Sequence, residues 1–274
     1  MISRQEQNEL TRFLEQDVSK GDITSKITPS MECVGEIKAN ENCVLAGIEE
    51  IVWLFNSKGL KINVFAKDGK KVKKGQKIVS VKGKNQKMLE CERVALNLLG
   101  RMSGVATICA EAKAISKTKV AVTRKTIPGF QWLDKKAAEI GGAWSHRKNL
   151  NEMILLKENH LKFFNSTKEA IVKAKKTRGK KVEVEVETFE QAIEAASENP
   201  YMIMLDNFSS KEAGKTIKEL RKTGYKNKIE LSGGINLKNL EKYSDLDADI
   251  ISMGALTKNA KIVDFNMNIE KAKK

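Results

Sequence analysis

The second half of the chain repeats one pattern, in which a short apolar run is followed by polar or glycine residues and then by an amphipathic helix. Strands are expected at residues 120–123, 153–156, 182–186, 202–205, 228–231 and 249–253. Strands that alternate with helices at this spacing predict parallel βαβ units. Six strands fall short of the eight of a complete barrel, so we expect an incomplete parallel α/β barrel. A doubly wound open sheet is the alternative.

Residues 1–104 show a different pattern, typical of an α+β unit. Leu10, Phe13 and Leu14 predict an amphipathic opening helix, and residues 48–55 have helical spacing. Residues 62–66, 72–75 and 77–81 alternate apolar and polar side chains around turn dipeptides, which predicts antiparallel strands. Residues 88–102 follow as a buried helix. The chain therefore divides into an N-terminal α+β domain, 1–104, and a barrel domain, 105–259.

The charge balance is strongly basic, with 50 Lys and Arg against 35 Asp and Glu, a net charge of +15. Polyanion binding, small anionic substrates and a merely Lys-rich surface could each explain it. Aromatic residues make up only 5% of the chain, which argues against a nucleic-acid partner. Only eight of the cations are Arg, and Arg93, Arg101, Arg124 and Arg147 lie within 55 residues near the middle, a fifth of the chain. This clustering favours recognition of small carboxylates or phosphates by Arg forks.

Targeting and redox signals are sparse. The N-terminal residues carry charges throughout, and no stretch approaches the roughly 20 apolar residues that cross a bilayer. We therefore expect a soluble, cytoplasmic protein with no membrane partner. Cys33, Cys43, Cys91 and Cys109 are widely spaced without a C-x-x-C pair, which predicts reduced, buried thiols.

The strand at 182–187 alternates Val and Glu, so Glu183, Glu185 and Glu187 share one face. If that face points into the barrel, its carboxylates need cationic partners. Candidate partners at neighbouring strand ends are Arg124, Lys125 and Lys157. An exposed edge strand with solvated Glu side chains is the alternative.

Two late strand ends carry glycines. Ser232-Gly233-Gly234 precedes a helix expected to begin near Leu237, and Gly254 closes the next strand. Bare N–H groups at a helix N-terminus bind phosphate well. Tight turns are the alternative explanation for these glycines.

Both histidines, His146 and His160, lie close to Arg147 and Lys157. Each could be an ordinary structural histidine, but their grouping with cations favours an anion site. The sequence contains no Walker A or G-x-G-x-x-G motif and no legible Ser/His/Asp or Cys/His arrangement.

Short motifs that match one family pattern occur in the same order along nearly the whole chain. They are Gly21-Asp22, Glu92-Arg93, Met102-Ser103-Gly104, Thr123-Arg124-Lys125-Thr126, Gly141-Gly142 with His146-Arg147, Leu156-Lys157-Glu158-Asn159-His160, Glu183-Val184-Glu185, Leu205-Asp206-Asn207, Ser232-Gly233-Gly234 and Gly254-Ala255-Leu256-Thr257. With them the chain closely resembles the quinolinate phosphoribosyltransferase family, the carboxylating nicotinate-nucleotide pyrophosphorylases.

This resemblance implies a type II phosphoribosyltransferase-like fold, an N-terminal α+β sandwich followed by the incomplete barrel, with residues 260–274 returning to the first domain. It implies a pentosyltransferase of NAD biosynthesis. Phosphoribosyl pyrophosphate and quinolinate would react, with Mg²⁺, to nicotinate mononucleotide, pyrophosphate and CO2. It also implies a homodimer with a shared active site.

The resemblance further assigns roles to matching residues. Those implied for quinolinate are Arg124, Lys125, His146, Arg147 and Lys157, with Arg93 of the partner subunit. Those implied for phosphoribosyl pyrophosphate are Glu185, Asp206, Ser232, Gly233, Gly234 and Gly254. The implied catalytic residues are Lys125, Lys157, Glu185 and Asp206, of which Glu185 and Asp206 would also attend the metal.

Four positions depart from the family pattern, namely Gln131, Ala143, Ser145 and Glu158. The cationic positions are all kept, so these departures bear on the acceptor rather than on the reaction class. The alternatives are phosphoribosyl transfer to nicotinate or a molybdenum-transport-associated, pyrophosphorylase-like protein.

Overall fold

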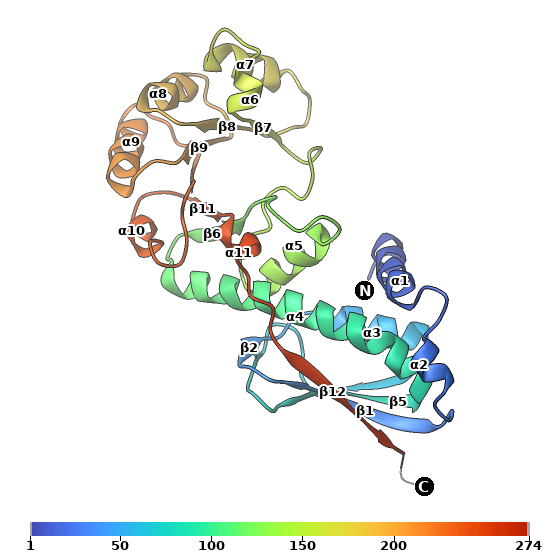
Figure 1. The fold of residues 1–274 in the computed structure, drawn as a ribbon. Coiled ribbons are helices and arrows are strands. Elements are labelled where there is room, and N and C mark those ends of the chain that lie inside the picture. The colour runs from blue at the N-terminus through green and yellow to red at the C-terminus, as the bar shows by residue number, and fades with distance from the viewer. Residues whose placement is uncertain (1, 273–274) are drawn as a thin grey trace. The chain divides into compact units, whose positions relative to one another are not determined.

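The computed structural model describes residues 2–272, which form two compact units. The first consists of Met1–Ile108 with Ala260–Lys274, and the second of Cys109–Asn259 (Figure 1). The expected boundary after residue 104 lies four residues before this division, inside one long helix. Among the described helices, none has the length and apolar character that a bilayer crossing requires.

The first unit is built on a four-stranded antiparallel sheet in the order β12-β1-β5-β3. Its strands are β1 (Glu32–Ala39), β3 (Lys61–Val64), β5 (Lys77–Lys84) and β12 (Phe265–Lys271). A small second sheet pairs β2 (Cys43–Val44) with β4 (Lys71–Val72). The antiparallel strands expected from alternation are therefore present, and the last strand of the chain completes their sheet.

Four helices belong to this part of the chain. They are α1 (Arg4–Val18), α2 (Ile23–Lys26), α3 (Ile48–Ser57) and α4 (Asn85–Ile115). The predicted opening helix buries Leu10 and Leu14 as expected. The helix predicted over 88–102 is longer at both ends. At its C-terminal end the apolar spacing continues through Val105, Ala106 and Cys109.

The segment that leads into β12 lies directly against α4. A Cβ atom on Gly104 would lie only 1.8 Å from the Lys261 carbonyl oxygen, and one on Gly100 only 2.7 Å from that of Val263. The Val263 N–H also donates to the Gly100 carbonyl at 3.1 Å. Gly100 and Gly104 are therefore needed because the two backbones touch there.

The second unit contains a six-stranded parallel sheet in the order β6-β11-β10-β9-β8-β7. Its strands are β6 (Lys119–Val122), β7 (Ile154–Leu156), β8 (Val182–Val186), β9 (Met202–Asp206), β10 (Lys228–Ser232) and β11 (Ile250–Met253). All six predicted strands are confirmed. From β7 to β11 each strand lies beside the next one in the chain, without the reversal of a doubly wound sheet, so the incomplete barrel is correct.

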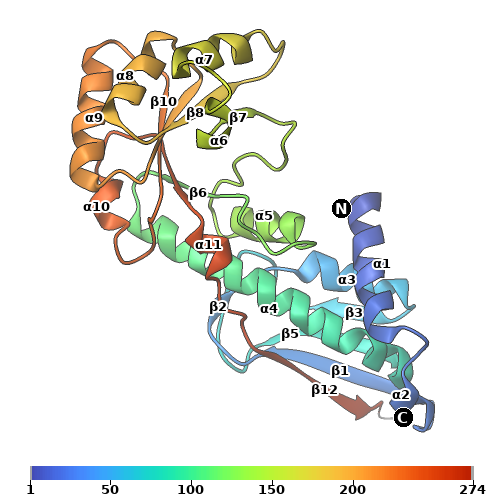
Figure 2. The ribbon, with the colours of Figure 1, turned by 45° about the horizontal axis from the view of Figure 1, so that its top comes forward.

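Helices surround these strands (Figure 2). They are α5 (Gln131–Ile140), α6 (Glu158–Leu161), α7 (Thr167–Lys175), α8 (Phe189–Ser197), α9 (Ser210–Lys222), α10 (Glu241–Ser244) and α11 (Ala255–Lys258). The helix expected near Leu237 is present only as one turn over residues 237–240, which is followed by the short α10. Asn236 caps this turn, because its side-chain oxygen accepts the Lys238 N–H and its carbonyl accepts the Leu240 N–H at 2.9 Å.

The barrel interior has an apolar layer and a polar layer. Ala121, Met153, Met202 and Ile250 form a buried cluster, with Trp144 and Tyr201 packed against it. Every residue of β8 is buried, and β8 lies between β7 and β9, so the edge-strand alternative for its glutamates is wrong.

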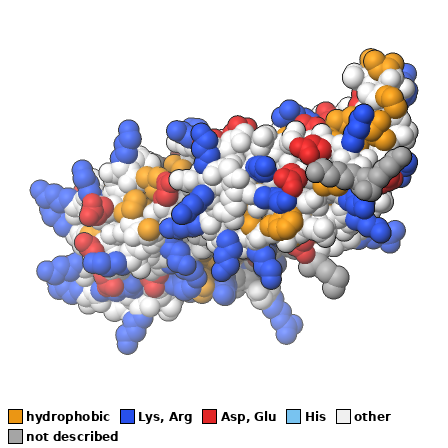
Figure 3. Space-filling model, turned by 90° about the horizontal axis from the view of Figure 1, so that it is seen from below, with side chains coloured by type: hydrophobic (Ala, Val, Ile, Leu, Met, Phe, Trp, Pro, Cys, Tyr) orange, Lys and Arg blue, Asp and Glu red, His pale blue; other side chains and the backbone are white. Residues whose placement is uncertain are grey.

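The basic side chains of the surface are spread out. On the face drawn in Figure 3, Lys and Arg are scattered and Asp and Glu lie between them. All four cysteines are free and buried, as expected. On this face the cations therefore form no single basic patch.

Candidate functional site

A pocket of about 460 Å³ opens at the carboxyl ends of the barrel strands. Side chains at or just beyond the ends of all six strands line it. Eight of the residues expected to bind substrate or metal are among them: Arg124, Lys125, His146, Arg147, Lys157, Glu185, Asp206 and Ser232. The convergence expected for parallel strand ends is therefore present in this unit.

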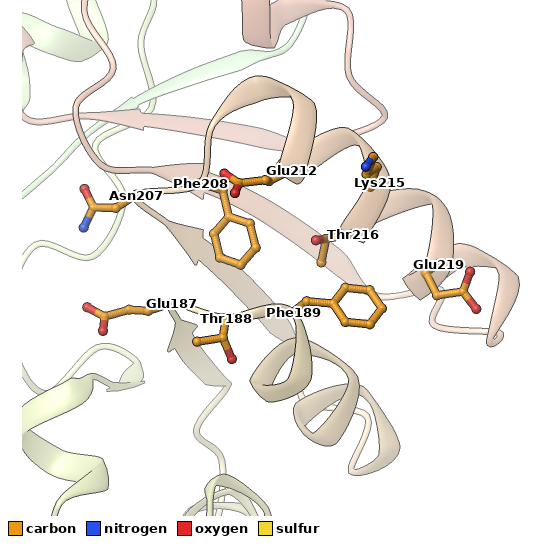
Figure 4. Close-up of a pocket in the computed structure, with 9 residues that line it drawn as sticks. All are labelled: Glu187, Thr188, Phe189, Asn207, Phe208, Glu212, Lys215, Thr216 and Glu219. Carbon is orange, nitrogen blue, oxygen red and sulfur yellow. The ribbon is translucent and has the colours of Figure 1, made fainter.

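A larger hollow of about 740 Å³ lies between α8 and α9 (Figure 4). Phe189, Phe208 and Thr216 approach one another there, and the carboxylates of Glu187, Glu212 and Glu219 outnumber its one cation, Lys215. Glu187 also lines the barrel pocket, but there five Lys and Arg side chains accompany five carboxylates, so we place the anion site in that smaller pocket.

Arg124 and Lys125 follow β6 and are exposed at the pocket. The Thr257 hydroxyl donates to the Lys125 carbonyl at 2.8 Å, and the Lys125 N–H donates to the Thr123 hydroxyl at 3.2 Å. These bonds hold the backbone after β6 while both side chains remain free to meet a ligand.

Arg147 enters the pocket from the segment between α5 and β7 and is only 7% exposed. Its guanidinium donates to the Met153 carbonyl at 3.4 Å. Burial, with the nearby Arg124, lowers the pKa of Arg147, but a guanidinium stays charged in proteins. The pocket therefore holds a partly desolvated cation beside two exposed ones, which favours an anionic ligand.

His146 precedes Arg147 with a positive φ of 52°, an uncommon conformation for a non-glycine residue. Its Nε2 lies 2.9 Å from Glu230 and 3.5 Å from Glu183, while its Nδ1 accepts the Arg147 N–H at 2.8 Å. Both ring nitrogens thus have partners within the protein. The ring ties the Arg147 backbone to two buried carboxylates.

The protonation of His146 is subject to opposing influences. Burial lowers its pKa, but hydrogen bonds and charges from Glu183 and Glu230 outweigh burial and raise it. A second ring proton conflicts with the Arg147 N–H, which needs a lone pair on Nδ1. The geometry favours the tautomer with its proton on Nε2, because only that form satisfies both contacts.

Glu183 and Glu230 are both fully buried in the barrel. Burial and the neighbouring charge of Glu230 raise the pKa of Glu183 to about 7. Among the described residues, neither Glu183 oxygen has a well-formed hydrogen bond. The sequence correctly indicates that β8 carboxylates face inward, although the partner of Glu183 is His146 rather than one of the expected Arg or Lys residues.

Glu185, two residues further along β8, forms an ion pair with Lys157. Burial raises the pKa of Glu185, and the charge of Asp206 adds to this effect, whereas Lys157 opposes it. Asp206 ends β9, and its carboxylate accepts the Asn207 side-chain N–H at 2.8 Å. Two carboxylates from adjacent strands and one Lys therefore share the rim of the pocket.

The expected phosphate glycines lie beside this pocket, and only Ser232 lines it. Gly233 has a φ of 86°, and a Cβ there would come within 2.3 Å of the Asn207 N atom. A Cβ on Gly254 would lie 3.0 Å from Lys125 Cδ. Both glycines therefore have a packing reason to be glycine, and their part in phosphate binding stays a prediction.

Two predicted residues lie elsewhere. Arg93 is exposed on α4, in the first unit, and does not line the pocket. His160 is exposed, and its Nδ1 accepts the Lys157 N–H at 3.1 Å, so it fixes the start of α6. Of the four departures from the family pattern, Glu158 lines the pocket, and Gln131 donates to the Lys148 carbonyl.

Sequence reasoning missed Lys135 and Glu230, which also line the pocket. Strand β10 alternates Lys228, Glu230 and Ser232 with apolar residues, the same signal that revealed the inward glutamates of β8. Lys135 lies on the buried face of α5 with Leu133 and Ala138. A Lys among apolar positions of a helix is a usable signal for a buried cation.

Comparison with known proteins agrees with this arrangement. Residues 22–103 match the N-terminal domain of the quinolinate phosphoribosyl transferase family, and residues 104–268 match its C-terminal domain. A probable nicotinate-nucleotide pyrophosphorylase [carboxylating] of Methanocaldococcus jannaschii is 40% identical over 95% of both chains.

Two further relatives extend this likeness. The nicotinate-nucleotide pyrophosphorylase [carboxylating] of Rattus norvegicus is 33% identical over 94% of this chain and 88% of its own. The crystal structure of NadC from Streptococcus pyogenes, 32% identical, superimposes with a TM-score of 0.91 over 98% of both chains. Through its sequence, its fold and its cationic barrel pocket, this chain belongs to the quinolinate phosphoribosyltransferase family.

Proposed function

We propose that this protein transfers the phosphoribosyl group of phosphoribosyl pyrophosphate to quinolinate with loss of CO2, giving nicotinate mononucleotide and pyrophosphate. The observation that carries the proposal is the meeting of Arg124, Lys125, Arg147 and Lys157 in one barrel pocket, with two carboxylates at its rim. The curated names of the full-length relatives support the same reaction.

The charges of the pocket suit the two substrates. Quinolinate carries two adjacent carboxylates, and Arg147 and Arg124 offer paired N–H groups that fit a carboxylate. Lys125 and Lys157 add charge for a second anionic group. Lys157 is paired with Glu185 in the structure, so an arriving carboxylate or phosphate competes for it.

The reaction depends mainly on orientation of the two substrates and on electrostatic stabilisation of the transition state, and it needs no covalent intermediate with the protein. The quinolinate nitrogen attacks the anomeric carbon, its bond forms, and the bond to pyrophosphate breaks as that group leaves with the electron pair. Glu185 and Asp206 face the ribose and stabilise its positive charge in the transition state. The ring nitrogen is then cationic, so the adjacent carboxylate departs as CO2 and its electron pair remains on the ring carbon, which takes up a proton.

Glu185 and Asp206 also fit a magnesium ion. They present carboxylate oxygens, the donors Mg²⁺ prefers, at the ends of adjacent strands. The charge of Asp206 raises the pKa of Glu185, and a cation held by both carboxylates would relieve this repulsion. Bound with the pyrophosphate, the ion supplies charge neutralisation to the leaving group.

We further infer a homodimer in which Arg93 of the partner subunit completes the quinolinate site. Arg93 is exposed on α4, so its guanidinium is accessible to such a contact. The four free, buried thiols suit a reducing compartment, so we place the enzyme in the cytoplasm.

The direct test mixes the purified protein with quinolinate, phosphoribosyl pyrophosphate and Mg²⁺ and measures nicotinate mononucleotide and CO2. A parallel reaction replaces quinolinate by nicotinate, which leaves half of a two-carboxylate clamp without a partner. We expect product from quinolinate and little from nicotinate. If quinolinate binds without giving product, or nicotinate reacts equally well, the protein acts on another acceptor, such as nicotinate or a molybdenum-related ligand.

A further inference from the structure

Lys135 is the most deeply buried cation of the pocket. It lies on α5 and is only 2% exposed, although it contributes to the pocket lining. Its ammonium donates to two backbone carbonyls, those of Ser145 and of Val122, the latter at 3.4 Å. These carbonyls belong to the segments that lead to Arg147 and to Arg124. Lys135 therefore binds the backbone two residues before each of the two pocket arginines.

An ammonium has three N–H donors, and the two carbonyls use two of them. Among residues 2–272, no carboxylate lies within ion-pair distance of Lys135. Two backbone carbonyls satisfy hydrogen bonds but supply no counter-charge, and a buried charge without a counter-ion is costly. The site is thus electrostatically incomplete without a ligand.

The charged neighbours of Lys135 also indicate that a ligand would favour its protonated form. Burial and the charge of Arg124, with a smaller contribution from Arg147, lower its pKa to about 8, against the opposing charges of Glu152 and of Glu139 on its own helix. A dianion in the pocket reverses this balance, because opposite charge favours the protonated amine.

We propose that Lys135 is a further binding residue for the acceptor, whose carboxylate supplies the counter-charge that the buried ammonium lacks. This proposal rests on the function proposed above. Substrate binding then draws a proton onto Lys135 in those molecules in which the amine is neutral. Acceptor binding and proton uptake are therefore linked at moderately alkaline pH.

The test is calorimetric titration of quinolinate into the protein at pH 6.5 and pH 8.5, each in two buffers of different ionisation enthalpy. With a pKa of about 8, much of Lys135 is neutral in the free protein at pH 8.5 and almost none at pH 6.5. We expect the wild-type protein to take up more protons per bound quinolinate than Lys135→Arg at pH 8.5, and the two proteins to agree at pH 6.5.

Three variants separate this role from a structural one. Lys135→Arg stays charged, so it should bind quinolinate without proton uptake, and Lys135→Met should bind at least tenfold more weakly with no uptake. Lys136→Met, at the next position of the same helix and outside the pocket lining, should behave as wild type in both respects.

Unchanged uptake in Lys135→Met, or none in the wild-type protein that binds quinolinate, would overturn the assignment while leaving the proposed function standing. If the wild-type protein does not bind quinolinate at all, the proposed function fails first. Because the wild-type measurement alone can contradict the proposal, it remains testable even where the Met variant folds poorly.

Discussion

The contact between α4 and the returning C-terminal segment allows a quantitative prediction for Gly104→Ala. The new Cβ would lie 1.8 Å from the Lys261 carbonyl oxygen, where real contacts stay beyond 3.0 Å, so the two backbones must separate by about 1.2 Å. Overpacking of this kind costs about 1–3 kcal/mol, and disturbing the bond from Val263 to Gly100 adds about 1 kcal/mol. The higher helix propensity of Ala offsets about 1 kcal/mol of this loss of stability.

The free energy of unfolding should therefore fall by about 2 kcal/mol, which lowers the melting temperature by roughly 4–8 °C in a chain of this size. Gly214→Ala in α9 is the matched control, because its Cβ would meet only the flexible end of Leu246 at 3.2 Å. That variant should be neutral or gain up to about 1 kcal/mol.

Differential scanning calorimetry of both variants measures the shift, and limited trypsin digestion at Lys258 and Lys261 reports whether the segment has loosened. We expect Gly104→Ala to melt earlier and to be cleaved faster there. If it melts at or above the wild-type temperature, as Gly214→Ala is expected to, the close backbone contact does not constrain this helix and the reasoning is wrong.

Three further outcomes follow from the site and the core. Arg147→Ala should lower kcat/KM for quinolinate at least 100-fold in steady-state assays, since the loss of a buried charged partner costs about 3 kcal/mol of binding free energy. Lys148→Ala, at an exposed position, should stay within threefold of wild type. An effect of only a few-fold at Arg147 would contradict its role in binding the quinolinate carboxylates. Chelation with EDTA should abolish turnover and added Mg²⁺ should restore it; activity that persists in EDTA excludes the ion. Burial raises the pKa of Cys91 and Cys109 to about 12, so iodoacetamide at pH 8 should label them only after denaturation, as mass spectrometry can show.

Much of the fold is predictable because its signals are local. The alternation of Val and Glu in β8, and the apolar runs of the other barrel strands, depend only on which face each side chain occupies. The helix expected near Leu237 is shorter than predicted, since Asn236 caps a single turn there before the short α10. A capping residue predicts where a helix begins but not how far it extends.

The candidate site was predictable where residues end a strand. Arg124, Lys157 and Asp206 are found this way, because parallel strands bring their ends together. The buried charges carry weaker signals. Lys135 reaches the pocket from a helix, and Glu230 has only the alternation of its strand, which resembles that of β8. Which of the inward carboxylates faces His146 depends on the three-dimensional contacts of separate strands.

The pairing of β12 with β1 has a consequence for the order of folding. The sheet of the first unit needs residues 265–271, which leave the ribosome only after the entire barrel has been synthesised. The barrel is continuous in sequence and can close first, whereas the N-terminal sheet waits with an open edge at β1. An unpaired strand edge invites association with other chains. The vulnerable period of this protein during synthesis therefore belongs to its N-terminal half, although that half is made first.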